Sequence, residues 1–337
     1  MATRSLRSNP GGSNRSGLRG ATSCLHHRIV PVRIAVVGAG GVGGYFGGRL
    51  AAAGVDVAFI ARGAHLAAMR ANGLRIFSPK GDAHVPRVTA TDNPREIGPV
   101  DVVLFAVKLY DTEAALPQLS ALVGPGTVVL PFQNGVDAVD IVTRAIGREH
   151  TAGGTCYVSA MIAEPGVIKH TAMDQLIFGE LDGSHSPRLE QLLDACRKTN
   201  FQATLSSNIT VDIWTKFTRL SVLSGMTAVT RSPLGVIVND PDLFAMLKAA
   251  LEEGVAVAHA KGVAVKGDMS DVARAYQALP FETKASMLVD LENGRRLELP
   301  WLSGAVARIG REVGVPTPIH SLIATVLKPK VNGGRTP

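Results

Sequence analysis

The sequence has few cysteines and no long apolar run. Three cysteines occur among 337 residues, at Cys24, Cys156 and Cys196, and none forms a CxxC pair. Their odd number and wide spacing indicate neither a disulfide framework nor a zinc knuckle, so we expect a reducing compartment and predict the cytoplasm. The longest apolar run, residues 102–107, ends at Lys108 and is far shorter than the roughly 18 to 20 residues that cross a bilayer. The sequence therefore predicts no membrane span and no membrane partner.

Acidic residues are missing from the first 28 positions, although five arginines lie there. These five account for most of the formal net charge of +7, and they are Arg4, Arg7, Arg15, Arg19 and Arg28. The rest of the chain is near neutral, with aromatics at only 5% and no basic stripe, so nucleic acid is not expected as a partner.

Residues 1–30 also lack a hydrophobic period, which predicts a disordered leader. An organellar transit peptide, a plain extension and a misassigned start codon are all compatible with this composition.

Motifs for metal and serine chemistry are absent. The nine histidines show no HExxH or facial-triad spacing, and no GxSxG elbow occurs. The adjacent His26 and His27 have no cysteine or carboxylate partners nearby in the sequence. We therefore predict no bound metal and no serine hydrolase.

What the chain does have, from position 33 onward, is an alternation of short β-branched runs with helix-length amphipathic stretches. Strands are predicted at residues 34–37, 57–60, 102–106 and 127–130. Helices are predicted around residues 50–53 and 65–72 and from position 112. This alternation is typical of a parallel sheet with crossover helices.

Two further strand regions interrupt or follow this pattern. Residues 74–77 and 84–90 flank a Ser-Pro-Lys-Gly-Asp turn and predict a hairpin insertion, and strands after position 151 turn at Pro165-Gly166. Beyond about position 208 the patterns are long and helical. The fold expected is an α/β Rossmann-type dinucleotide-binding domain at residues 31–206 followed by an all-α C-terminal domain at residues 207–330. A small ligand is expected in the cleft between the two.

A GxGxxG motif occupies residues 38–43, directly after the first strand and before the first helix. Gly38 allows the tight turn, Gly40 lets backbone amides approach a pyrophosphate, and Gly43 lets the helix pack closely on the sheet. The helix N-terminus favours the anion. A merely flexible glycine-rich loop is the alternative, and the flanking strand and helix argue against it.

The second strand ends with Arg62 where an NAD site would carry an acid for the ribose hydroxyl. Asp56 stands at the start of that strand, too early for this role. A guanidinium there can pair with a 2′-phosphate, which favours NADP(H) as the cofactor. The alternative for Arg62 is an ordinary exposed loop arginine.

Three residues have the right type and place for chemistry. Lys216 lies among apolar residues in Ile-Trp-Thr-Lys-Phe, where burial would make its ammonium a usable proton donor near neutral pH. Glu298 precedes a predicted helix, and Asn134 follows a strand at the edge of the sheet where ligands collect. Taken alone, Lys216 is more often a surface lysine, and spacing alone favours a helix-terminal acid for Glu298. Asn134 is equally read as part of a plain Asn-Gly turn.

Together with the glycine motif, these segments resemble the ketopantoate reductase family over about residues 33–329. The matching motifs are IAVVGAGGVGGYFGGRL, the ARG after the second strand, AVKLYDT with Lys108, FQNGV, WTK, the TAV at Thr227, and SMLVDLENGRRLE from Ser286 to Glu298. The resemblance implies NADPH-dependent reduction of 2-dehydropantoate to (R)-pantoate, a step of pantothenate and coenzyme A synthesis. The substrate partner would be a small 2-oxo acid.

The family's site residues carry over by position. The resemblance implies cofactor binding by Gly38, Ala39, Gly40, Gly41, Val42, Gly43, Arg62, Lys108, Asn134 and Glu298. It implies substrate binding by Asn134, Lys216 and Ser286. Lys216 would be the general acid, and Glu298 would help organise the closed site.

Three positions depart from the family pattern, because Leu220, Ser224 and Leu234 stand where the family carries asparagines. Losing hydrogen-bonding partners relaxes discrimination between substrates, so a different, more apolar branched 2-oxo acid is an alternative. A non-catalytic NADP(H)-binding sensor is a third hypothesis, although a pure sensor has no need of Lys216 and Glu298. The oligomeric state stays open, with a homodimer as one option.

Overall fold

The computed structural model describes residues 32–334. The disordered leader predicted at residues 1–30 lies outside this range. Five short 3-10 helices connect the larger elements, at Pro94–Glu96, Leu109–Asp111, Arg148–His150, Leu299–Trp301 and Lys328–Lys330. No helix in the described part of the chain is long and apolar enough to cross a membrane.

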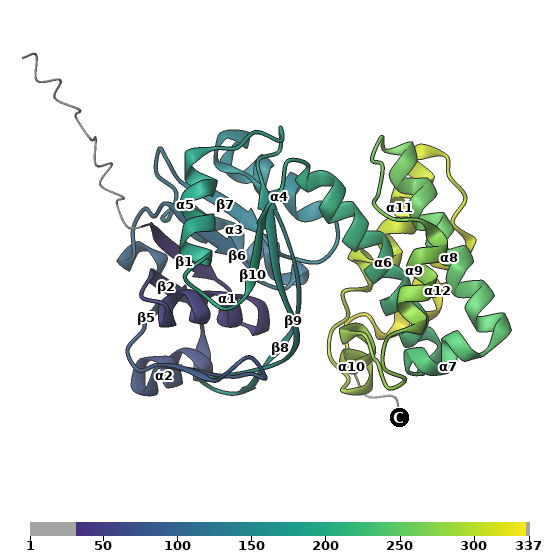
Figure 1. The fold of residues 1–337 in the computed structure, drawn as a ribbon, viewed down its shortest axis with the longest axis horizontal. Helices are drawn as coiled ribbons and strands as arrows, with labels where there is room; N and C mark the ends of the chain where they lie inside the picture. Colours follow the sequence, from purple (N-terminus) through teal and green to yellow (C-terminus); the bar gives the residue numbers. More distant parts are fainter. Residues whose placement is uncertain (1–31, 335–337) are drawn as a thin grey trace, which may run out of the picture. The chain divides into compact units, whose positions relative to one another are not determined.

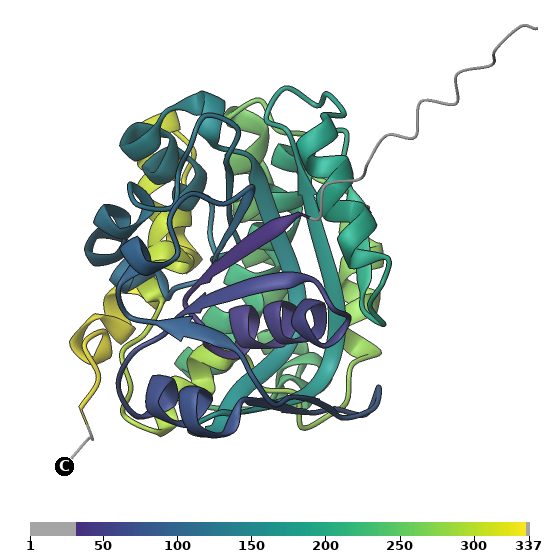
Figure 2. The same cartoon turned by 90° about the vertical axis from the view of Figure 1, so that its left-hand side faces the viewer.

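The first layer is a parallel sheet of five strands in the order β5-β2-β1-β6-β7 (Figures 1 and 2). Its strands are β1 (Arg33–Val37), β2 (Asp56–Ile60), β5 (Thr89–Thr91), β6 (Val102–Phe105) and β7 (Val128–Pro131). Its helices are α1 (Gly41–Ala52), α2 (Gly63–Asn72), α3 (Thr112–Leu119) and α4 (Asp137–Ile146). The chain runs outward from β1 to β2 and then returns to β6 on the other side of β1. This reversal places a ligand crevice at the carboxyl ends of β1 and β6.

A second sheet joins strands from distant parts of the chain, in the order β10-β9-β3-β4 with β8 paired to β9. Its members are β3 (Leu74–Phe77), β4 (Ala83–Val85), β8 (Gly153–Glu164), β9 (Val167–Gly179) and β10 (Gln202–Leu205). Helix α5 (Pro187–Cys196) leads into β10. The turn predicted at Pro165-Gly166 is confirmed, because β8 and β9 pair as an antiparallel hairpin around it.

The predicted hairpin of residues 74–77 with residues 84–90 is only half right. Strand β3 pairs with β4 antiparallel, but the pairing ends at Val85. Pro86 follows and has no backbone N–H for the ladder. The chain then leaves this sheet, and Thr89–Thr91 pairs in parallel with β2 of the first sheet.

Helix α1 lies between the two sheets and explains why its sequence is rich in glycine. A Cβ at Gly44 would lie 2.6 Å from the Ile168 side chain of β9, and one at Gly47 would lie 2.6 Å from the Val36 side chain of β1. Glycine at these positions lets the helix backbone approach both sheets, and the apolar core is continuous across them.

The second half of the described chain is helical, as predicted. Its helices are α6 (Ile209–Thr230), α7 (Leu234–Asn239), α8 (Pro241–Ala260), α9 (Met269–Gln277), α10 (Ser286–Glu292), α11 (Ser303–Val313) and α12 (Pro318–Leu327). Helix α6 begins where the Asn208 side chain accepts a hydrogen bond from the Val211 amide, and α8 begins at the Asp240 cap followed by Pro241. These helices share an apolar core of their own. The expected fold class is confirmed, and the domain boundary at 206/207 remains a proposal between β10 and α6.

Candidate active site

A cavity of about 440 Å³ opens at the carboxyl ends of β1, β2, β6 and β7. It collects residues from the glycine-rich turn, from the ends of these strands, from β8, and from the helical half of the chain. The sequence-predicted site residues that line it are Gly38, Ala39, Gly40, Gly41, Val42, Arg62, Lys108, Asn134, Lys216, Ser286 and Glu298. Gly43 is the only one of the predicted site residues that does not line it.

The glycine-rich turn has the shape that a pyrophosphate requires. Gly38 has φ +96°, and a Cβ there would lie 2.7 Å from the Val107 amide nitrogen. Gly40 precedes α1, and a Cβ there would meet no heavy atom within 4 Å, so the turn is open toward the cavity at this point. The first amides of α1 have no partner within the helix and can bind an anion. Gly43 acts in packing, because a Cβ there would lie 2.2 Å from the Gly38 carbonyl oxygen.

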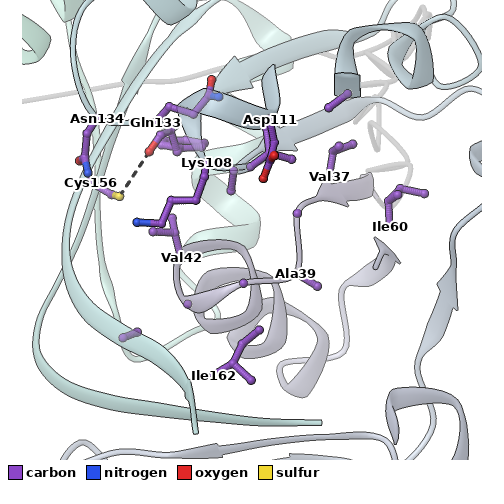
Figure 3. Close-up of a pocket in the computed structure, with 18 of the residues that line it drawn as sticks. Val37, Ala39, Val42, Ile60, Lys108, Asp111, Gln133, Asn134, Cys156 and Ile162 are labelled. Carbon is purple, nitrogen blue, oxygen red and sulfur yellow. Dashed lines mark hydrogen bonds between the residues drawn. The ribbon is translucent and has the colours of Figure 1, made fainter. Parts of the chain in front are cut away.

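Strand β8 forms a wall of the cavity that sequence reasoning missed. Every second residue of the strand from position 156 lines the cavity, namely Cys156, Val158, Ala160 and Ile162. Figure 3 shows the first and last of these, Cys156 and Ile162. The strand passes directly over the start of α1, where a Cβ at Gly41 would lie 2.1 Å from the Ala160 carbonyl oxygen. The two-residue alternation was the available signal, but only the tertiary structure shows which face of β8 meets the cavity.

Arg62 lies at the N-cap position of α2 and borders the cavity. Its side chain is exposed and forms no ion pair with any residue in the range 32–334. His65 follows on the first turn of α2, where its Nδ1 accepts a hydrogen bond from the Gly166 amide at 3.1 Å. Burial lowers the pKa of His65, despite the nearby Ala39 carbonyl.

A hydrogen-bonded series links three predicted site residues. The Lys216 Nζ donates to Asn134 Oδ1 at 2.9 Å, and Asn134 Nδ2 donates to Glu298 Oε2 at 3.0 Å. Glu298 is 5% exposed. Lys216 belongs to α6, and Asn134 lies in the loop after β7. Glu298 directly precedes the 3-10 helix Leu299–Trp301. The Asn-Gly turn and the helix-terminal acid are therefore parts of one polar site.

Lys108 joins the same series from the carboxyl end of β6. Its Nζ lies 3.6 Å from Glu298 Oε2 and 3.8 Å from Asp290 Oδ2. Burial draws the pKa of Lys108 down, but the carboxylates of Glu298 and Asp290 outweigh burial and hold the pKa above its ordinary value. Burial raises the pKa of Asp290 even though Lys108 opposes the shift. Asp290 was not among the predicted site residues, and its only signal is its place one turn after Ser286.

Two more side chains surround the Lys216 ammonium. The Lys216 Nζ lies 5.8 Å from the centre of the Tyr157 ring, close enough for a cation–π contact. Burial raises the pKa of the Cys156 thiol, although Lys216 opposes the shift. Lys108, Val42 and Cys156 line the same cavity (Figure 3). The cavity wall here combines a lysine side chain with apolar and weakly polar neighbours.

The three positions that depart from the family pattern do not line the cavity. Leu234 is buried in the core of the helical half, and Leu220 packs against that core while partly exposed. Ser224 is fully buried, and its hydroxyl has no hydrogen-bond partner within the described residues. The structure therefore places the two leucines in packing roles.

In the described part of the chain, no group of three or more His, Cys, Asp or Glu residues could hold a metal ion. The residues present fit a dinucleotide instead, with an open turn for the pyrophosphate and a cation at the end of β2. Beyond that turn, the cavity holds an amine, an amide and a carboxylate in hydrogen-bonding contact. This fold and site are those of a dinucleotide-binding oxidoreductase.

Comparison with known proteins agrees with this class. The family profile described as ketopantoate reductase PanE/ApbA matches residues 34–183, and the profile of the family's C-terminal domain matches residues 208–331. The chain therefore belongs to the ketopantoate reductase family. The 2-dehydropantoate 2-reductase of Mesorhizobium japonicum is 33% identical over 333 residues, covering 90% of this chain and 99% of that protein.

Solved structures agree as well. The 2-dehydropantoate 2-reductase of Geobacter metallireducens matches with a TM-score of 0.83 at 30% identity, covering 88% of this chain and 99% of the other. A PanE/ApbA family ketopantoate reductase of Ralstonia eutropha matches with a TM-score of 0.81 at 30% identity, covering 89% and 98%. Each is similar to this chain over nearly its whole length.

Proposed function

We propose that this protein catalyses the NADPH-dependent reduction of 2-dehydropantoate to (R)-pantoate, a step of pantothenate biosynthesis. The observation that carries the proposal is the hydrogen-bonded series Lys216, Asn134 and Glu298 in the same cavity as the glycine-rich turn. Relatives named 2-dehydropantoate 2-reductase support the substrate.

Lys216 has the properties of the proton donor in this reaction. A ketone that accepts a hydride becomes an alkoxide, which needs a proton and a positive charge close to its oxygen. Bound NADPH would supply the hydride. The Lys216 ammonium supplies the proton and the charge, while the Asn134 carbonyl oxygen fixes its position at 2.9 Å. The Ser286 hydroxyl, on the first residue of α10, is the second group proposed to bind the substrate.

Glu298 orients the amide of Asn134. Because Asn134 Nδ2 donates to Glu298 Oε2, its oxygen is turned toward Lys216. Lys108 and Asn134 share the same carboxylate oxygen, so Glu298 also holds Lys108 near the cofactor end of the cavity. We propose positioning of cofactor and substrate as the role of Glu298, with proton donation assigned to Lys216.

The cofactor is proposed to be NADP(H) because of Arg62. An exposed guanidinium at the end of β2, with no carboxylate partner within residues 32–334, can form a bidentate pair with a 2′-phosphate. An NAD site would carry an acid there. The turn at residues 38–43 is proposed to bind the pyrophosphate.

The test is NADPH oxidation, followed by absorbance, with the purified protein and 2-dehydropantoate. A panel of branched and straight 2-oxo acids and an NADH arm serve as controls. We expect selective turnover of 2-dehydropantoate with NADPH. Turnover of another 2-oxo acid alone would replace the substrate, and tight NADPH binding without turnover on any of them would favour the sensor hypothesis.

A different branched 2-oxo acid is the second candidate function. It comes from the sequence, in which Leu220, Ser224 and Leu234 replace three family asparagines, although none of the three lines the cavity. Two further sequence predictions stay predictions, namely the cytoplasmic location and a homodimer. The ketopantoate reductase of Staphylococcus aureus, described as dimeric, shares the fold with a TM-score of 0.73 at 21% identity.

A further inference from the structure

A second cavity, of about 530 Å³, lies beside the active site and has no part in the proposed reaction. Its floor is one row of the second sheet, because Tyr157 of β8 pairs with Gln175 of β9, and Gln175 pairs with Gln202 of β10. Paired residues on neighbouring strands present their side chains on the same face. The floor therefore offers a phenol and two amides side by side.

One face of α6 and the loop after α8 form the facing wall. Asp212, Thr215 and Arg219 recur at helical spacing along α6, and Lys266 lies opposite them. The Lys266 amide donates to Thr215 Oγ1 at 2.9 Å, and Arg219 Nη2 donates to the Lys266 carbonyl at 2.8 Å. These bonds tie the loop to the helix and hold the Arg219 side chain in place.

In the described part of the chain, Arg219 lines this cavity without a carboxylate partner, because the acidic side chains of the cavity are paired with lysines. Asp212 accepts hydrogen bonds from Lys266 Nζ and from the Ser206 hydroxyl, both at 2.5 Å. Asp174 is paired with Lys80. Arg219 pairs with no carboxylate among the residues that the structure describes, and one bond to a carbonyl uses one of its five N–H donors. A fixed guanidinium with free donors therefore faces a cavity whose two acids, Asp174 and Asp212, are already paired with lysines.

We propose that this cavity binds a small organic anion whose carboxylate or phosphate pairs with Arg219 and whose polar groups contact Gln175 and Gln202. A guanidinium fork matches both oxyanions in geometry and charge. The site is distinct from the cofactor cavity, with which it shares none of its lining residues.

The bound anion acts on the active site through Tyr157 and α6. The Tyr157 side chain belongs to the floor of the second cavity, and its ring lies 5.8 Å from the Lys216 Nζ. Lys216 follows Thr215 directly in α6, so the same helix borders both cavities. Anion binding therefore shifts the position of the Lys216 ammonium and changes the rate of the reduction.

The experiment is isothermal titration of the NADP⁺-saturated protein with inorganic phosphate in one arm and malonate in the other. Saturation with NADP⁺ keeps the probe away from the glycine-rich turn and Arg62, and the cavity variants below separate the second cavity from the substrate end of the first. We expect saturable millimolar binding of at least one probe, and the arm that binds more tightly identifies phosphate or carboxylate as the preferred group. No saturable binding of either probe overturns the proposal.

Three variants decide whether the binding occurs at this cavity. Arg219→Gln should weaken binding at least tenfold, and Lys198→Gln, which removes one charge from an exposed position, should leave it unchanged. Gln202→Glu places a carboxylate on the exposed edge of the floor and should also weaken binding, which keeps the test valid if Arg219→Gln fails to fold. Equal binding by wild type and both cavity variants would overturn the assignment.

The titration does not depend on the proposed reaction. If the protein binds no NADP⁺, the same comparison is made on the protein alone, with Arg62→Gln added to remove binding at the cofactor cavity. The rate arm uses wild type with 2-dehydropantoate and NADPH, and we expect the anion that binds to change kcat at least twofold. An unchanged kcat with confirmed binding would overturn the coupling through Tyr157.

Discussion

Arg308 of α11 holds both carboxylate oxygens of Asp137, the first residue of α4, at 2.7 and 2.9 Å. Asp137 follows Asn134 by three residues, and α11 begins shortly after Glu298. Close by, the backbone at Gly135 has φ +84° and lies against the Trp301 carbonyl oxygen, 2.8 Å from where a Cβ would stand. The ion pair and this close approach fix the two chain segments that carry Asn134 and Glu298.

The first prediction concerns this ion pair. Asp137→Asn removes the charge and one of the two carboxylate acceptors, so we expect about 1 kcal/mol less stability and a few-fold lower kcat/KM. Urea unfolding and steady-state kinetics measure the two effects. Asp140→Asn, on the exposed side of the same helix, is the matched control and should change neither. Equal effects of the two variants would show that the pair does not position the site.

The second prediction concerns Lys216, the proposed proton donor. Lys216→Ala should lower kcat by about 10² to 10⁴, the usual contribution of general acid catalysis, while NADPH binding stays nearly intact. Single-turnover kinetics and a fluorescence titration with NADPH separate the two quantities. Lys261→Ala, at an exposed position after α8, is the control. A kcat within threefold of wild type would remove Lys216 from the mechanism.

The third prediction concerns cofactor choice. Arg62→Gln should raise the Kd for NADPH by about 10- to 100-fold, because a hydrogen bond between charged groups contributes about 1.5 to 3 kcal/mol. The Kd for NADH should change little, since NADH has no 2′-phosphate. Arg70→Gln removes an equal charge from an exposed position of the same helix. Parallel losses for NADPH and NADH would place Arg62 away from the 2′-phosphate.

The fourth prediction concerns stability in acid. His320 is fully buried in α12, and burial lowers its pKa to about 4 despite a hydrogen bond to the Ala250 carbonyl. Unfolded chains take up this proton near pH 6.5, so the free energy of unfolding should be constant above that pH and fall between pH 6.5 and 4. The loss attributable to His320 approaches about 3 kcal/mol.

The comparison that checks this prediction is chemical denaturation of wild type, His320→Gln and His259→Gln between pH 4 and 8. His320→Gln should flatten the dependence on pH, whereas the exposed His259→Gln should follow wild type. Burial raises the pKa of the neighbouring Glu253, which accepts hydrogen bonds from the Ile319 and His320 amides. Its contribution has the opposite sign, but it is common to all three proteins. Parallel curves for wild type and His320→Gln would contradict the assignment.

Sequence reasoning reached much of the candidate site because several motifs are local. The turn at residues 38–43 needs only a strand before it and a helix after it, and the structure has both at the expected places. Arg62 was found in the same way, from its place at the end of a short strand. Sequence reasoning missed that alternate residues of β8, from Cys156 to Ile162, line the cavity. It also missed that Asp290 pairs with Lys108. Both contacts depend on which distant segments of the chain pack together.

The sequence by itself determined the class of fold. Short strand and helix patterns alternate up to about position 208, and long helical patterns follow. It also determined the glycine-rich turn proposed to bind phosphate, because the constraints on those glycines act within a few residues. Only the tertiary structure decided that Asn134 lies between Lys216 and Glu298, and that Leu220 and Leu234 pack in a core. The reason is physical: 164 residues separate Asn134 from Glu298 in the sequence, and contacts of Asp137 with Arg308 and of Gly135 with Trp301 bring their segments together.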